Sequence, residues 1–205
     1  MDDKLVWIDC EMTGLDLVHD ALIEVAVLVT DFELNVVGDG IDVIVKPPQA
    51  ALEQMNDFVT SMHTDSGLLE ELDGGMTLAD AEDAVLTCVR EHVSEPRKAP
   101  LAGNSVGTDR AFLVRDMPEL EAYLHYRIVD VSSIKELSRR WYPRVYYAAP
   151  EKSGNHRALA DIQESIEELR YYRSAVFVPQ PGPDSETARG LAAEHGGSLR
   201  GADQD

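Results

Sequence analysis

Residues 4–16 read KLVWIDCEMTGLD, a mostly apolar run that carries two carboxylates shortly before a turn. The apolar residues predict a buried β-strand over residues 4–10. Because strand side chains alternate between faces, Trp7, Asp9 and Glu11 are expected to share one face. Two neighbouring carboxylates at the end of a buried strand repel each other unless a cation lies between them. The stretch therefore predicts a central strand with a candidate cation site at its end.

The segments after this strand predict an α/β domain. Strands rich in Val and Ile are expected at residues 21–31 and 36–45, and three successive strands indicate an antiparallel meander. Helices that alternate with short strands follow, which is typical of a mixed sheet. Thr77 and Ser132 are expected to cap two of these helices. The expected helices cover residues 51–62, 65–72, 78–93, 107–117, 133–141 and 158–175, and the expected short strands cover residues 100–104 and 127–131.

One globular domain is expected over residues 1–178, because 205 residues with 44% hydrophobic content can form a substantial core. Residues 179–205, which begin PQPGPDSETARG, are rich in Pro, Gly and polar side chains and are expected to form a flexible tail. The acidic N-terminus leads directly into a strand, which leaves no room for a signal peptide. Two cysteines are too few for a disulfide framework. We therefore expect a cytoplasmic location.

Acidic residues dominate the first half of the chain. The net charge is −20, and residues 1–100 carry 22 acidic and 5 basic side chains. Because proteins hold long nucleic acids mainly through Lys and Arg contacts to phosphates, this charge disfavours binding along a long duplex. It does not exclude a short anionic substrate whose site is neutralised by divalent metals. For most of the surface acids, solubility is the simpler interpretation.

Three residues later in the chain are further candidates. Asp109 lies in the first turns of a helix after a short strand, where a carboxylate either interacts with the helix dipole or faces the end of the sheet. His156 and Asp161 are five residues apart, which on one continuous helix would point them about 140° apart. They converge only if His156 lies in the preceding loop, as Gly154 indicates. Each motif alone is weak, because an isolated D-x-E is common and a histidine before a helix is usually just exposed.

In the order D-x-E, a later D and then H-x4-D, these residues resemble the histidine subclass (DEDDh) of the DEDD exonuclease superfamily. Longer stretches resemble the oligoribonucleases in particular: WIDCEMTGLD, GNSVGTDRAFL, MPELEAYLHYRIVDVSSIKELSRRWYP and HRALADIQESIEELRYYR. MPELEAYLHYR has no role in holding metal, which makes this resemblance specific. Residues 142–153 and the tail match poorly.

The resemblance implies a ribonuclease H-like mixed β-sheet flanked by helices. It also implies a 3′-to-5′ exoribonuclease that releases nucleoside 5′-monophosphates from short RNA, dinucleotides especially. Two divalent metal ions, Mg²⁺ or Mn²⁺, are implied to stabilise the attacking and leaving oxygens. His156 is implied as the general base, a role in which histidine is the commonest side chain. The implied metal ligands, which are also catalytic residues, are Asp9, Glu11, Asp109 and Asp161.

The resemblance further assigns contacts to the body of the substrate. Leu15 stands at the position of an apolar wedge against the bases, and His63 stands at a position near the substrate. Phe58 stands where the family more usually has Trp, and it can still stack on a base with less area. The plainer alternative for Phe58 is a buried aromatic.

Ser105, Arg127 and Ser132 match residues that cap a 5′ phosphate of the substrate, for which an arginine is well shaped. A closed end that rewards a 5′ phosphate would explain a preference for two nucleotides. Tyr126 matches a residue that the family delivers into the active site of the partner subunit, which implies a homodimer. The plainer alternatives are an interface tyrosine at Tyr126 and a simple helix cap at Ser132.

Two other functions remain open on the sequence. A proofreading-type exonuclease of the same subclass, acting on longer DNA or RNA, needs the same five catalytic residues. The acidic first half and the phosphate-cap residues disfavour it. A metal-free binding protein that keeps the fold has no need for four clustered carboxylates. An exonuclease for short RNA is therefore the favoured hypothesis.

Overall fold

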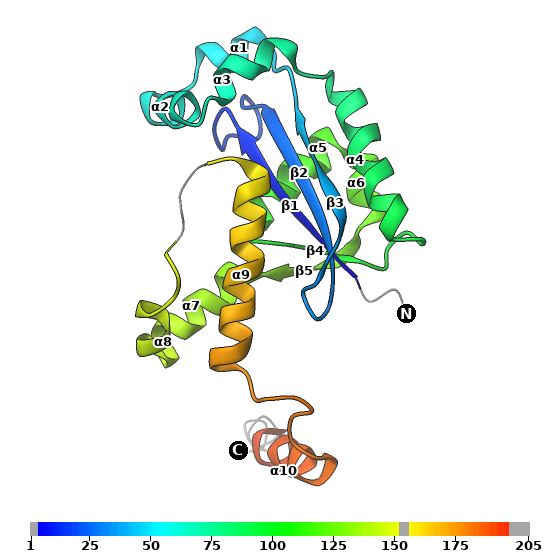
Figure 1. Ribbon diagram of the computed structural model, residues 1–205, viewed down its shortest axis with the longest axis vertical. Helices are drawn as coiled ribbons and strands as arrows, with labels where there is room; N and C mark the ends of the chain where they lie inside the picture. The colour runs from blue at the N-terminus through cyan, green and yellow to red at the C-terminus, as the bar shows by residue number, and fades with distance from the viewer. Residues whose placement is uncertain (1–3, 152–155, 197–205) are drawn as a thin grey trace, which may run out of the picture.

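The computed structural model describes residues 4–151 and 156–196 (Figure 1). The strands are β1 (Lys4–Met12), β2 (Leu22–Asp31), β3 (Val36–Ile44), β4 (Pro100–Gly103) and β5 (His125–Asp130). The helices are α1 (Gln49–Glu53), α2 (Asp57–Asp65), α3 (Leu68–Glu71), α4 (Leu78–His92), α5 (Gly107–Asp116), α6 (Pro118–Tyr123), α7 (Val131–Trp141), α8 (Pro143–Tyr147), α9 (Ala158–Val176) and α10 (Ser185–Gly196), with a 3₁₀ turn at Leu72–Gly74.

The five strands form one sheet in the order β3-β2-β1-β4-β5. β1 pairs antiparallel with β2, and β2 pairs antiparallel with β3. β4 runs parallel to both of its neighbours, β1 and β5. The expected antiparallel meander and mixed sheet are therefore confirmed.

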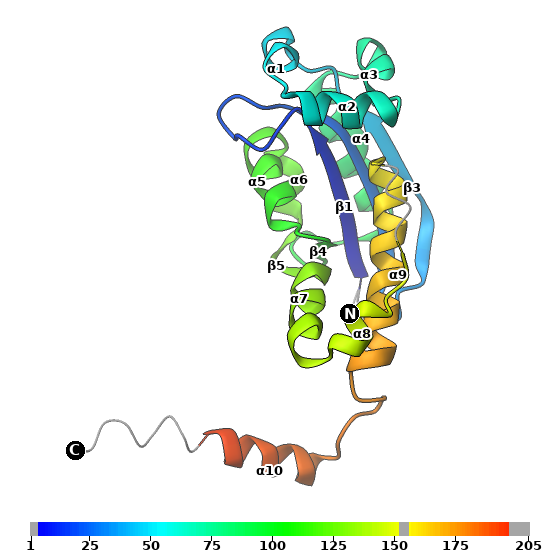
Figure 2. The same ribbon diagram turned by 90° about the vertical axis from the view of Figure 1, so that its left-hand side faces the viewer.

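Helices cover both faces of the sheet (Figures 1 and 2), and the alternation of β1 decides what each face contacts. Val6 and Ile8 lie in a core that includes residues of α4 and α5. Trp7 lies in a second core with Ile162 and Tyr172 of α9. The buried indole of Trp7 also donates a hydrogen bond to Thr30 Oγ1 at 2.9 Å. The predicted alternation along β1 is therefore confirmed, and it directs the face of Asp9 and Glu11 toward α9.

Two predictions about helix starts need correction. The helix expected over residues 51–62 is two helices, because Asn56 begins a new one by accepting a hydrogen bond from the backbone N–H of Val59. Ser132 is not the cap of α7. Asp130 is the cap, and its carboxylate accepts from the backbone N–H of Ser132 at 2.9 Å. The prediction for Thr77 is confirmed, since its hydroxyl accepts from the backbone N–H of Asp80 at the start of α4.

Three short or peripheral helices, α6, α8 and α10, were not predicted. α10 falls in the segment expected as a flexible tail, has no buried residue, and stands apart from the domain in both views (Figures 1 and 2). The domain boundary at residue 178 and the flexibility of the tail stay predictions. None of the helices in the described part of the chain has the length and apolar character that a membrane span requires.

Candidate active site

The carboxyl ends of β1, β4 and β5 meet at one edge of the sheet, because these three strands are parallel. The register pairs Trp7 with Ala102, and Gly103 with Asp130. Side chains just beyond these positions therefore lie at a common edge. Open α/β sheets bind their ligands outside the carboxyl ends of neighbouring strands.

Carboxylates from β1 and α9 converge at this edge. One oxygen each of Asp9, Glu11 and Asp161 lies within 4.8 Å of the other two. Asp161 reaches this place because it lies in the first turn of α9, which packs on the Trp7 face of β1. His156 lies before that helix rather than in it, as expected.

Asp109 lies beside this group but is held by a different contact. It is in the first turn of α5 and is 7% exposed. Its Oδ1 accepts a hydrogen bond from the backbone N–H of Cys10 at 3.0 Å, and Cys10 separates Asp9 from Glu11 in the sequence. Among the described residues, the cluster of oxygens that all lie within 4.8 Å of one another consists of Asp9, Glu11 and Asp161 and does not include Asp109. The structure thus brings three of the four predicted carboxylates into one cluster and anchors the fourth on the same strand end.

Burial and mutual repulsion raise the pKa values of these carboxyl groups. The pKa of Asp9 rises to about 9, chiefly through burial and then through the charges of Asp109 and Glu11. The pKa of Glu11 rises to about 8, again through burial first and then through Glu24 and Asp161. The pKa of Asp109 rises to about 6 through burial, against which backbone hydrogen bonds act. In each group, burial and neighbouring negative charges outweigh the contacts that favour the ionised form, including the charge of Arg157 near Glu11.

A cluster of carboxylate oxygens with raised pKa values fits a divalent cation. Hard ions such as Mg²⁺ and Mn²⁺ prefer oxygen ligands. Positive charge placed among Asp9, Glu11 and Asp161 would favour their ionised forms and remove the repulsion. Asp109 is near enough to raise the pKa of Asp9, so it belongs to the same electrostatic site.

A buried carboxylate on β2 fixes the segment between the predicted base and the predicted ligand on α9. Glu24 is fully buried. Its Oε1 accepts from Arg157 Nε at 2.8 Å, and its Oε2 accepts from the backbone N–H of Ala158 at 3.0 Å. These bonds hold the chain between His156 and Asp161. Glu24 was not predicted from the sequence, although it stands out there as an acidic residue in the middle of the apolar part of β2, which ends at Asp31.

His156 itself is exposed and has a φ of 49°. This left-handed conformation is uncommon for a residue other than glycine, and strained backbone of this kind occurs disproportionately at functional sites. The loop predicted at residues 154–157 falls partly on residues 152–155, which lie outside the described residues.

His63 is buried beside the carboxylates. Its Nε2 donates to the backbone oxygen of Met12 at 2.9 Å, and burial lowers its pKa, which favours the neutral ring. In that ring the lone pair is on Nδ1, which lies 4.0 Å from Glu11 Oε2. No hydrogen-bond partner for Nδ1 is present in the described part of the chain. A buried acceptor therefore faces the carboxylate cluster.

Two large apolar side chains project into solvent near this end of the sheet. Leu15 follows β1 and is 72% exposed, and Phe58 lies in the first turn of α2 and is 76% exposed. The alternative of a buried aromatic at Phe58 is therefore wrong. Both side chains are available to contact a ligand.

Two of the residues predicted to cap a phosphate, Ser105 and Ser132, lie together just beyond the ends of β4 and β5, whereas Arg127 lies in the first half of β5. Ser105 Oγ donates to Ser132 Oγ at 3.1 Å. Asp130 Oδ1 accepts from the backbone N–H groups of both serines, at 3.0 Å and 2.9 Å. Arg127 is exposed, with its guanidinium 5.4 Å from the ring centre of Tyr126. Tyr126 is itself 63% exposed.

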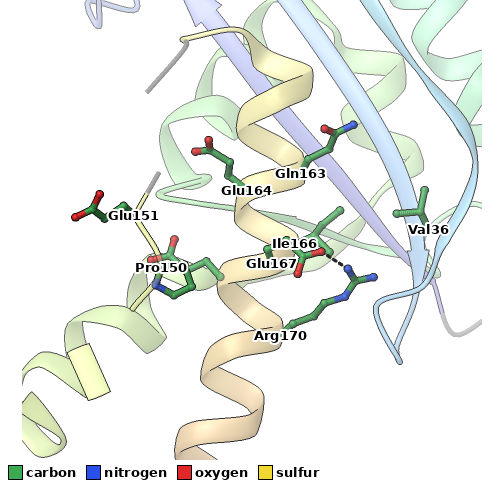
Figure 3. A pocket seen from close by; sticks show the side chains of 9 residues that line it. Val36, Pro150, Glu151, Gln163, Glu164, Ile166, Glu167 and Arg170 are labelled. Atoms are coloured by element: carbon green, nitrogen blue, oxygen red, sulfur yellow. Dashed lines mark hydrogen bonds and ion pairs between the residues drawn. The ribbon is translucent and has the colours of Figure 1, made fainter. Parts of the chain in front are cut away.

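A cavity of about 570 Å³ beside α9 is a poorer place for an anionic substrate (Figure 3). Its lining includes none of the four carboxylates of the site, and Glu151 and Glu164 contribute negative charge. The cation in this lining, Arg170, is paired with Glu167, as Figure 3 shows. The edge of the sheet is therefore the better candidate for the active site.

The sequence matches the exonuclease family over residues 6–169. The oligoribonuclease of Streptomyces coelicolor is 73% identical over 195 residues, which cover 95% of this chain and 98% of that protein. The oligoribonuclease of Cutibacterium acnes is 64% identical, with 98% of this chain and 100% of that protein covered. The oligoribonuclease of Mycobacterium tuberculosis is 59% identical, with 95% and 91% covered.

Solved structures of exonuclease I share the fold. A product-bound exonuclease I gives a TM-score of 0.64 at 16% identity, covering 85% of this chain and 44% of that one. A zinc-bound E. coli exonuclease I with single-stranded DNA gives 0.64 at 17%, covering 86% and 41%. This chain thus spans less than half the length of either structure, and the likeness confirms the expected ribonuclease H-like fold. By its sequence match over residues 6–169 and its close similarity to relatives of nearly equal length, the chain belongs to the exonuclease family and, within it, to the oligoribonucleases.

Proposed function

We propose that the protein is a 3′-to-5′ exoribonuclease that hydrolyses short oligoribonucleotides, especially dinucleotides, to nucleoside 5′-monophosphates. The convergence of carboxylates from β1 and α9 at the carboxyl edge of the sheet is the observation that carries this proposal. The oligoribonuclease names of relatives at 59–73% identity support the choice of short RNA. A cytoplasmic location is part of the proposal.

The roles of the site residues follow from their chemistry. Divalent ions, Mg²⁺ or Mn²⁺, would supply charge stabilisation for the attacking and leaving oxygens. Asp9, Glu11, Asp109 and Asp161 would hold them. His156 accepts the proton of the attacking water, and its exposed position leaves room for a water and a substrate beside it.

Exposed apolar side chains and a polar end would bind the substrate. Leu15 wedges against the bases and Phe58 stacks on one of them, since aromatic side chains stack on nucleobases regardless of sequence. His63 is fully buried, so it lies beneath the substrate position with its Nδ1 facing Glu11 and has no exposed surface for direct contact. At the other end, the hydroxyls of Ser105 and Ser132, with the guanidinium of Arg127, cap a 5′ phosphate.

Substrate length provides the direct test. Hydrolysis of 5′-phosphorylated RNA of two nucleotides is expected to exceed that of RNA of about twenty nucleotides by at least about tenfold in kcat/KM, because the cap closes the site. Product analysis should show nucleoside 5′-monophosphates, and a chelator should abolish the reaction. Faster hydrolysis of the longer RNA would instead favour a proofreading-type enzyme.

Asp109→Asn tests the role of the carboxylates. The amide oxygen can still accept from the backbone N–H of Cys10, so the fold should be retained, whereas the loss of one charge should weaken metal binding. We expect kcat to fall on the order of 10³-fold or more, as for other members of a catalytic unit. Asp83→Asn, an exposed acid on α4, is the matched control and should leave kcat unchanged. Equal activities of the two variants would exclude Asp109 from the site.

The raised pKa values predict how pH and metal act on stability. Folded-state pKa values of about 9 for Asp9 and about 8 for Glu11 exceed the ordinary 3.8 and 4.5. The folded metal-free chain therefore holds protons that the unfolded chain has released, and its free energy of unfolding falls as the pH rises from about 5 to about 9. Bound Mg²⁺ replaces those protons. The increase in Tm on adding Mg²⁺ should thus be larger at about pH 8.5 than at about pH 6, and an increase independent of pH would contradict metal binding here.

The homodimer, with Tyr126 contributed across subunits, is tested by mixing. Light scattering should give twice the chain mass of 22.6 kDa. Tyr126→Ala and Asp109→Asn should each be nearly inactive alone. In a mixed dimer, the Tyr126→Ala subunit keeps its carboxylates and receives Tyr126 from its partner, so mixing should restore roughly a quarter of wild-type activity. If confirmed mixed dimers showed no recovery of activity, Tyr126 would not contribute to the active site of the partner subunit.

A further inference from the structure

A chain of hydrogen bonds connects the predicted phosphate cap to the first turns of α9. It begins where Ser105 Oγ donates to Ser132 Oγ at 3.1 Å, and Ser132 Oγ donates to Asn104 Oδ1 at 3.2 Å. The amide nitrogen of Asn104 donates to Ser165 Oγ at 2.7 Å and to Glu168 Oε2 at 3.1 Å. Asn104 therefore joins the ends of β4 and β5 to α9.

The chain continues to the carboxylate cluster. Ser165 Oγ donates to the backbone oxygen of Asp161 at 2.7 Å. Glu168 is nearly buried, and its Oε1 also pairs with Lys135 Nζ of α7 at 3.0 Å. Ser165 is buried as well. The turn that carries Asp161 is thus bonded, through buried groups, to the residues that carry the cap.

The orientation of the Asn104 amide follows from its partners. Ser165 has used its one hydroxyl hydrogen on Asp161, so toward Asn104 it can only accept. The carboxylate of Glu168, which pairs with Lys135, is likewise an acceptor. Both therefore require the NH₂ group of Asn104, which leaves its oxygen facing Ser132. A reversed amide would place its oxygen against a carboxylate and lose both hydrogen bonds to α9.

The backbone at Ser105, the residue after Asn104, is also held by hydrogen bonding. Ser105 has a φ of 52°, a left-handed conformation that costs energy in a residue other than glycine. The hydrogen bond from its backbone N–H to Asp130 Oδ1 offsets this cost. Asp130 also accepts from the backbone N–H of Ser132, so both serines are held by one carboxylate.

We propose that Asn104 is a positioning residue for substrate specificity: with Ser165 and Glu168, it sets the place of Ser105 and Ser132 relative to Asp161. The spacing between the cap and the carboxylates determines which length of RNA engages both. This inference rests on the proposed function. Asn104 does not touch the substrate. It acts through the two serines.

The test compares two dinucleotide substrates, one with a 5′ phosphate and one with a 5′ hydroxyl. Asn104→Ala and Ser165→Ala should each lower kcat/KM for the phosphorylated substrate about tenfold more than for the hydroxyl substrate, mainly through KM, because network bonds near a charged group are lost. Ser174→Ala is the matched control. Its hydroxyl also donates to the carbonyl four residues earlier in α9, at 3.0 Å, but lies outside the network. The control should keep the wild-type ratio.

Each outcome separates the inference from the proposed function. Equal losses on both substrates in Asn104→Ala and Ser165→Ala would reveal a structural role only and overturn the inference. If the wild-type enzyme hydrolysed both substrates equally well, the proposed phosphate cap and this inference would both be overturned. The proposed exoribonuclease activity would still stand. A wild-type enzyme that hydrolyses neither with metal present would overturn the proposed function itself.

Discussion

Burial and repulsion make the carboxylates at the end of β1 unfavourable as ions, and the surrounding structure holds them together. Asp9, Glu11 and Asp161 place oxygens within 4.8 Å of one another in a largely buried setting. Such a cluster is unfavourable on its own. It persists because the surrounding elements over-determine it: Trp7 and α9 share a core, Asp109 is bonded to the strand, and Glu24 holds the start of α9. The fold thus holds these carboxylates in an arrangement whose electrostatic repulsion a bound cation would remove.

The sequence predicted the parts that depend on short-range regularity. Alternation along one strand was enough to place Trp7, Asp9 and Glu11 on one face, and the three-strand meander followed from apolar runs separated by turns. The geometry of a helix was enough to require His156 before α9 and Asp161 within it. These features follow from periodicities of 2.0 and 3.6 residues, which are visible in the sequence itself.

The parts that could not be predicted depend on partners distant in sequence. Glu24 reads as an odd acid in an apolar strand until Arg157 and Ala158, more than 130 residues later, are seen to bond to it. Asn104 reads as the last residue of a short strand until Ser165 and Glu168 are seen to orient its amide. The cap of α7 was assigned to Ser132 instead of Asp130, because both types are good caps and only the backbone decides between neighbours.

The acidic charge of the chain limits how the protein can bind RNA. With 22 acidic and 5 basic residues among the first hundred, the surface has little capacity to hold a long polyanion by its phosphates. Arg127 is the one Lys or Arg residue among those proposed to contact substrate, and its side chain is exposed. Under the proposed function, attraction for RNA would come from metal ions at one end, from Leu15 and Phe58 against the bases, and from the proposed phosphate cap at the other end. A ligand short enough to reach all three gains every contribution, whereas each further nucleotide adds negative charge against an acidic surface.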